Sequence, residues 1–95
     1  MGIKVFFFKS KGCPQCQATA PAFNQVAETL KDKIQVNAID IMEDMQTAID
    51  NGVMSVPTII IFRDNIELKR LNGIVSKDKL EKTIREFLEE PTAGR

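Results

Sequence analysis

The stretch VFFFKSKGCPQC, residues 5–16, joins a short apolar run to two cysteines that stand three positions apart. The run contains β-branched and aromatic residues with little alternation, which is typical of a strand buried on both faces of a sheet. Pro14, between the cysteines, suits the first turn of a helix, where its missing N–H is harmless. This stretch therefore predicts a buried strand, a short loop and a helix that begins at the cysteine pair.

The cysteine pair has three interpretations, because Cys13 and Cys16 are the two cysteines of a chain that has no histidine. A zinc or iron–sulfur site needs about four soft ligands, so a second chain or bound glutathione would have to complete it. A structural disulfide here would close a ring too short to constrain much of the unfolded chain. In a reducing cytosol a lone CxxC is more often catalytic or metal-binding than structural. We therefore expect a redox-active dithiol with no metal and no cofactor.

The composition is that of an ordinary globular domain, with 95 residues, of which 43% are hydrophobic and 27% charged. Thirteen basic and thirteen acidic residues cancel, which argues against nucleic acid and an anionic membrane surface as partners. No segment reaches the roughly 18 apolar residues of a membrane span, and we expect no signal peptide. A secreted domain of this size would often carry more cysteines. We therefore expect a cytoplasmic monomer.

Helical spacing continues beyond the cysteines to about residue 30. Pro21 falls inside this helix and should kink it, because a proline removes one backbone hydrogen bond and clashes with the preceding turn. Residues 34–41 are an apolar, partly alternating run, which predicts a second strand. The predicted helix that begins at the cysteines has an apolar face of Phe23, Val26, Ala27 and Leu30.

A short helix is predicted next, because apolar residues recur at helical spacing ahead of a plausible C-terminal cap, Asn51-Gly52. Its apolar positions are Met42, Met45 and Ile49. We expect the two methionines to lie in the core.

The last third of the chain predicts two further strands and a helix. Residues 59–62 form a buried strand, Asp64-Asn65 a tight turn whose residue types tolerate positive φ, and residues 66–69 an alternating edge strand. Ser76 can cap a last helix with a core face of Leu80, Ile84, Phe87 and Leu88. The order β-α-β-α-β-β-α predicts an α/β fold with a four-stranded mixed sheet flanked by three helices. We expect one domain over residues 1–89 and a flexible tail over residues 90–95.

A strand, a CxxC at the start of a proline-containing helix, and VPT at residues 56–58 before a buried strand resemble the thioredoxin family. The resemblance covers residues 3–88 and implies the thioredoxin fold, thiol–disulfide oxidoreductase activity and a cis Val56–Pro57 bond that faces the cysteines. Three spacings support it: Pro21 lies eight residues after Cys13, Gly52 five before Pro57, and Gly73 sixteen after Pro57.

The chain also departs from ordinary thioredoxins. It lacks their extra N-terminal strand and helix, has Gly12 where they have a tryptophan, and has Phe7 where they have a buried aspartate. Its small size, its Cys-Pro-x-Cys motif and the flanking KSK at residues 9–11 look more like glutaredoxin. However, NGIV at residues 72–75 lacks the glycine and acidic pairs expected for glutathione binding. The chain thus resembles a small, glutaredoxin-sized thioredoxin with a CPQC site.

The resemblance implies a role for each cysteine. Cys13 would be the nucleophile, because the N–H groups and dipole at a helix N-terminus stabilise a thiolate and lower its pKa. Cys16, one turn later and partly covered, would resolve the mixed disulfide. Phe7 cannot deprotonate Cys16, so water, the substrate or another acid such as Asp40 would supply that step, although Asp40 is equally placed to cap a helix.

Further residues are predicted around Cys13. Lys9 and Lys11 either add positive potential that lowers the thiol pKa or are solvated loop residues. Met54 belongs either to an apolar substrate-binding rim or to the core. The residues expected to bind the substrate are Val56, Pro57, Gly73 and Met54.

Three functions stay open on the sequence. The first is a dithiol reductase of protein disulfides, served by a flavin- or ferredoxin-linked reductase or by glutathione. The second is a glutathione-dependent glutaredoxin, which residues 72–75 disfavour. The third is a redox-inactive binding module, which the two intact cysteines disfavour. Fold alone does not decide among them, whereas the cysteine pair and Pro57 favour the first.

Overall fold

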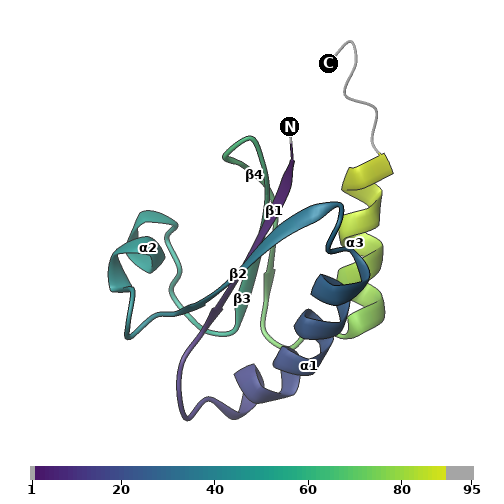
Figure 1. Ribbon diagram of the computed structural model, residues 1–95. Coiled ribbons are helices and arrows are strands. Elements are labelled where there is room, and N and C mark those ends of the chain that lie inside the picture. The colour runs from purple at the N-terminus through teal and green to yellow at the C-terminus, as the bar shows by residue number, and fades with distance from the viewer. Residues whose placement is uncertain (1, 90–95) are drawn as a thin grey trace.

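The structure is a computed structural model that describes residues 2–89. It has the predicted order of elements and the predicted α/β fold, built on one four-stranded mixed sheet (Figure 1). The predicted tail, residues 90–95, lies outside the described residues. The elements are β1 (Ile3–Lys9), α1 (Pro14–Thr29), β2 (Ile34–Asp40), α2 (Met45–Asp50), β3 (Thr58–Arg63), β4 (Ile66–Asn72) and α3 (Lys77–Glu89).

The strands lie in the order β2-β1-β3-β4. β1 is parallel to β2 and antiparallel to β3, and β3 is antiparallel to β4. β4 is therefore an edge strand, as predicted, and the turn before it has φ of 53° at Asp64 and 68° at Asn65. α1 and α3 cover one face of the sheet and α2 the other (Figure 1). Among residues 2–89, no helix is both long and apolar enough to cross a membrane.

Two apolar layers explain why the central strands have almost no alternation of polar and apolar residues. Ile3, Val5 and Phe7 of β1 are buried in the layer that includes residues of α1 and α3, whereas Phe8 is buried in the layer that includes Ala48 of α2. β3 divides in the same way between the two layers. A strand that is covered on both faces needs apolar side chains at successive positions.

The long helices follow the predicted patterns. α1 continues through Pro21 and buries Phe23 and Val26, while α3 buries Leu80 and Ile84. The Ser76 Oγ accepts a hydrogen bond from the Lys79 N–H at 3.1 Å, which confirms the predicted cap.

The prediction that Met42 and Met45 lie in the core is wrong. Met42 precedes the helix and is 69% exposed, and Met45 is 56% exposed. α2 is only six residues long and buries Ala48 alone. A helix this short, resting on the sheet through a small side chain, leaves its larger apolar residues at the surface.

Candidate functional site

Cys13 and Cys16 form a disulfide at the N-terminus of α1, with their Cα atoms 5.2 Å apart. Cys13 is the N-cap residue, and its backbone is extended where Pro14 begins the helix. The Cys16 N–H donates to the Cys13 Sγ at 3.1 Å. Cys13 is half-buried, whereas Cys16 is only 3% exposed. Cys13 is therefore the more exposed of the two cysteines.

The Val56–Pro57 peptide bond is cis, as the family resemblance implied. The strand pairing brings this bond to the end of the sheet that carries the cysteines. Phe8 near the end of β1 pairs with Thr58 at the start of β3, and Thr58 pairs with Asn72 at the end of β4. The CxxC loop, Pro57 and the turn at Gly73 consequently share one end of the sheet.

Hydrogen bonds join two of these loops. The Gly73 N–H donates to the Pro57 carbonyl at 2.9 Å, and Gly73 has a φ of +84° that favours glycine. The Thr58 Oγ1 lies 2.8 Å from the Ser55 carbonyl oxygen and 3.0 Å from the Asn72 Oδ1. Thr58 is 1% exposed, so these contacts are partly buried. The turn at Gly73 therefore supports the residues around Pro57.

The predicted substrate-binding side chains differ in exposure. Met54 is 95% exposed, so it belongs to the surface and not to the core. Val56 and Gly73 are half-buried, and Pro57 is buried. Ile74, beside Gly73, is 60% exposed. The two loops thus present apolar side chains to solvent at the end of the sheet that carries the cysteines.

The family model for thioredoxin matches residues 3–86. The chain belongs to the thioredoxin family. It is 32% identical over 82 residues to a thioredoxin from Alicyclobacillus acidocaldarius, covering 86% of this chain and 78% of that one. It is 39% identical over 62 residues to a thioredoxin from Methanocaldococcus jannaschii, covering 65% of this chain and 73% of that one.

A solved structure of a mutant thioredoxin from Halobacterium salinarum has the same fold, with a TM-score of 0.85 at 27% identity. The match covers 94% of this chain and 77% of that chain. Thioredoxins are thiol–disulfide oxidoreductases, and this chain has the paired cysteines in place. The protein is therefore a thiol–disulfide oxidoreductase of the thioredoxin family.

The two lysines before the thioredoxin CxxC lie beside Cys16. Lys9 and Lys11 line a shallow hollow together with Gly12, Cys16 and Gln17. The Lys11 Nζ is 3.8 Å from a Glu43 carboxylate oxygen, and both side chains are strongly exposed, so this ion pair contributes little to stability. The predicted effect of the lysines on the thiol pKa stays a prediction.

Phe7 is buried at the position where ordinary thioredoxins have an aspartate, with 1% exposure. Asp40 does not cap α2. Its Oδ1 accepts the Met42 N–H at 2.8 Å, whereas the cap is Asp44, whose carboxylate accepts the Thr47 N–H at 3.2 Å. Asp40 therefore closes the turn after β2.

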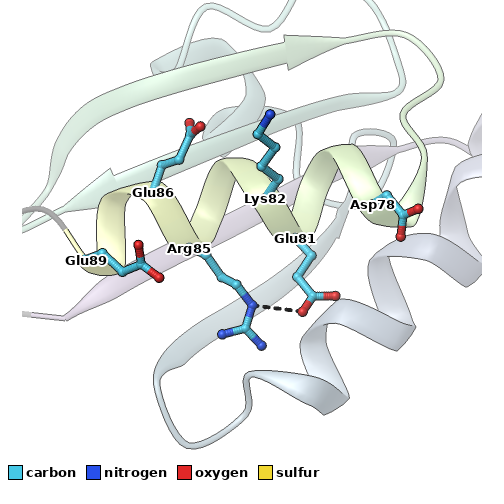
Figure 2. Close-up of a pocket in the computed structure, with 6 residues that line it drawn as sticks. All are labelled: Asp78, Glu81, Lys82, Arg85, Glu86 and Glu89. Carbon is cyan, nitrogen blue, oxygen red and sulfur yellow. Dashed lines mark hydrogen bonds and ion pairs between the residues drawn. The ribbon is translucent and has the colours of Figure 1, made fainter.

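A larger hollow lies on the outer face of α3, and neither cysteine lines it (Figure 2). Charged side chains line it, and Glu81 bonds to Arg85 at 2.9 Å and to Lys77 at 3.1 Å. These hydrogen bonds, the one from Arg85 foremost, lower the pKa of Glu81. Such i, i+4 pairs are typical of a solvated helix surface. Within residues 2–89, no three acidic, cysteine or histidine side chains gather as metal ligands.

Sequence reasoning missed one residue that contacts the segment leading to Pro57, Arg70 of β4. Its Nη2 donates to the Asn51 carbonyl at 2.7 Å, and its Nη1 lies 3.3 Å from the Gly52 carbonyl oxygen. Arg70 also bonds to both carboxylate oxygens of Glu67, at 2.8 Å each. No motif marks such a residue, because the contact joins an edge strand to a helix end that is 18 to 19 residues away in the sequence.

Proposed function

We propose that this protein is a dithiol reductase of protein disulfides, with Cys13 as the nucleophile and Cys16 as the resolving thiol. The observation that carries the proposal is the contrast between the two sulfurs at the start of α1. Cys13 is half-buried and its Sγ accepts the Cys16 N–H, whereas Cys16 is 3% exposed. An N–H that points at a sulfur stabilises its thiolate, which is the attacking species in disulfide exchange.

The reaction has two exchange steps. The Cys13 thiolate attacks one sulfur of a substrate disulfide, so that a Cys13–substrate disulfide forms while the substrate S–S bond breaks and its other sulfur leaves as a thiolate that takes up a proton. The Cys16 thiol loses its proton, and its thiolate then attacks the Cys13 sulfur. The Cys13–Cys16 disulfide forms while the Cys13–substrate bond breaks, and the second substrate sulfur leaves as a thiolate that takes up the proton given up by Cys16. Two electrons pass from the protein to the substrate in total.

Substrate binding is assigned to the two loops beside the cysteines. Val56 lies in the bend just before β3, where its backbone groups can pair with an extended substrate by strand addition. Met54, Gly73 and Ile74 supply the apolar rim, and Pro57, which is buried, lies next to Val56. Methionine suits such a surface, because its flexible thioether adapts to differently shaped partners. This combination favours recognition of a peptide segment over recognition of one small molecule.

The oxidised protein needs an electron donor to complete the cycle. A flavin- or ferredoxin-linked reductase is the donor we propose, with glutathione as the alternative, and the cytoplasm is the proposed location. The support is that the curated relatives are thioredoxins and that both cysteines of the chain belong to the redox pair. A dithiol kept ready for reduction belongs in a reducing compartment.

The reduction potential of the Cys13–Cys16 pair tests the proposal. The protein would be equilibrated in parallel against glutathione and dithiothreitol buffers, and its insulin reduction assayed with Cys13→Ser as control. A potential of about −270 mV or lower, with insulin reduction that the control lacks, is the expected result. A potential of about −200 mV would favour the glutathione-dependent function instead. Absence of a reversible two-electron couple would leave only a metal site or a redox-inactive binding module.

A further inference from the structure

We propose that Arg70 is a positioning residue that holds the substrate-binding loop in place from the edge strand β4. The proposal rests on the proposed function, in which residues 53–57 contact the substrate. Arg70 makes no contact with the cysteines in any described interaction. It bonds instead to the backbone at the point where α2 ends and this loop begins.

An irregularity in the sheet places Arg70 and Glu67 on the same face. In a regular strand, residues three apart point to opposite faces. The β3–β4 register shifts between Ile61 and Phe62, so Leu68 is an extra residue without a partner on β3. As a result Arg70 lies opposite Ile60 and Glu67 lies opposite Phe62. Ile60 and Phe62 both belong to the apolar layer under α2, and residues opposite each other in a ladder share a face.

The carbonyls that Arg70 contacts lie at the C-terminal end of α2. Asn51 is the C-cap residue of that helix and Gly52 follows it with φ of +64°. Carbonyls at a helix end have no partner within the helix, and a cation there is favoured by the helix dipole. Glu67 holds the guanidinium with two bonds of 2.8 Å. Glu67 thus fixes the orientation of the Arg70 guanidinium, whose remaining N–H groups hold the Asn51 and Gly52 carbonyls.

The other end of the same loop is also tied to β4. The Gly73 N–H donates to the Pro57 carbonyl, and Thr58 contacts both Ser55 and Asn72. Residues 53–56 are therefore held at both ends by β4, through Arg70 at one end and through Asn72 and Gly73 at the other. Met54 stands in the middle, 95% exposed. A loop that is held in its binding conformation before the substrate arrives loses less entropy on binding.

The test compares Arg70→Met, which keeps the aliphatic stem, with Arg70→Lys, which keeps the charge but loses the fork. Lys69→Met is the matched control, because it removes one charge from an exposed neighbour on β4. Two measurements are made on each variant. The first is amide hydrogen exchange at residues 52–56. The second is enzyme kinetics, with kcat and KM measured for insulin. The rate with hydroxyethyl disulfide is measured beside them, because this disulfide is too small to contact the loop and the cysteines together.

We expect Arg70→Met to speed exchange at residues 52–56 and to raise KM for insulin by about tenfold, the equivalent of about 1.4 kcal/mol. The rate with hydroxyethyl disulfide and the reduction potential should equal those of Lys69→Met and the unaltered protein. In Arg70→Lys, the exchange rate and the KM for insulin should lie between those of Arg70→Met and those of the unaltered protein. Unchanged exchange in Arg70→Met would overturn the proposal, as would an unchanged insulin KM or an equal loss with both substrates. If the unaltered protein fails to reduce insulin, the proposed function fails, and exchange alone still tests the attachment.

Discussion

Phe7 packs against Phe23, with ring centroids 4.9 Å apart and ring planes inclined by 41°. The contact joins the central strand β1 to the middle of α1, the helix whose first turn holds both cysteines. Aromatic pairs in this geometry add to the free energy of burial itself. The aspartate position of ordinary thioredoxins is thus part of the core that holds the cysteine helix against the sheet.

Replacing Phe7 by aspartate should lower the free energy of unfolding by at least about 3 kcal/mol, from the lost aromatic volume alone. The loss should be larger at neutral pH, because the site buries a carboxylate without a partner. Urea unfolding measures the change. Phe7→Leu is the control and should lose clearly less, since it keeps the site apolar. Equal losses for the two variants would show that the new carboxylate escapes to water.

Thr19 is a buried residue whose replacement should stabilise the protein, whereas replacing Phe7 by aspartate should destabilise it. The Thr19 side chain is 0% exposed, and its Oγ1 has no hydrogen-bond partner among the described residues. Thr19→Val removes a buried hydroxyl at nearly constant shape and should raise the free energy of unfolding by about 1 kcal/mol. Thr83→Val is the matched control, because the Thr83 Oγ1 donates to the Lys79 carbonyl at 2.7 Å. That variant should be destabilised in the same unfolding experiment. A loss in both would mean that Thr19 has a partner in solution.

Cys16→Ser should accumulate a covalent adduct between Cys13 and a substrate, because the half-buried Cys13 thiol can still attack while nothing resolves the product. Mass spectrometry under non-reducing conditions would detect the adduct, and dithiothreitol would release it. Cys13→Ser should trap no adduct and should reduce no insulin. An adduct that formed on Cys16 in that variant would reverse the assigned order of the two cysteines.

Acid should weaken the pairing of Glu67 with Arg70 in a defined pH range. The hydrogen bonds from Arg70 are the largest cause of the lowered pKa of Glu67, whose ordinary value is 4.5. A carboxyl group with a lowered pKa in the folded state stabilises the protein fully above its ordinary pKa. That contribution is lost as the pH falls through the lowered value. The stability difference between the unaltered protein and Glu67→Gln should therefore be constant above about pH 5.5 and shrink in stronger acid.

Urea unfolding at a series of pH values measures this difference. Glu43→Gln serves as the control for net charge, because it removes a carboxylate from an exposed ion pair with Lys11. A difference for Glu67→Gln that stayed the same down to the strongest acid tested would show that the pair contributes nothing through its charge.

Most of the fold was predictable because both faces of the central strands are covered. The runs at residues 3–8 and 59–62 have apolar side chains on both faces, a pattern that a surface strand does not need. The cysteine pair was equally predictable, since its surroundings are local patterns. The CxxC contains Pro14, Pro21 follows at a known spacing, and Val56-Pro57 precedes a buried strand. Turn residues such as Asp64-Asn65 carry their backbone preference with them.

Two features were beyond sequence reasoning, and both depend on contacts between distant segments. Spacing alone cannot tell whether a six-residue helix buries Met45 or Ala48, because the answer depends on how closely the helix approaches the sheet. The role of Arg70 depends on the extra residue Leu68 in β4, and no rule on alternation anticipates a shifted register. Residues 66–69 read as a regular edge strand because such a shift leaves no compositional mark.

Among residues 2–89 the two apolar layers differ in size, with twelve buried residues in the layer under α1 and α3 and five in the layer under α2. Regions with few buried apolar contacts open at a lower free energy than the rest of a protein. Warming should therefore loosen α2 and its neighbours while α1 still holds the cysteines in register. The half of the molecule that carries the dithiol should therefore stay folded longest, and we expect the loop before Pro57 to keep its place through its attachments to β4 and not through the smaller layer under α2.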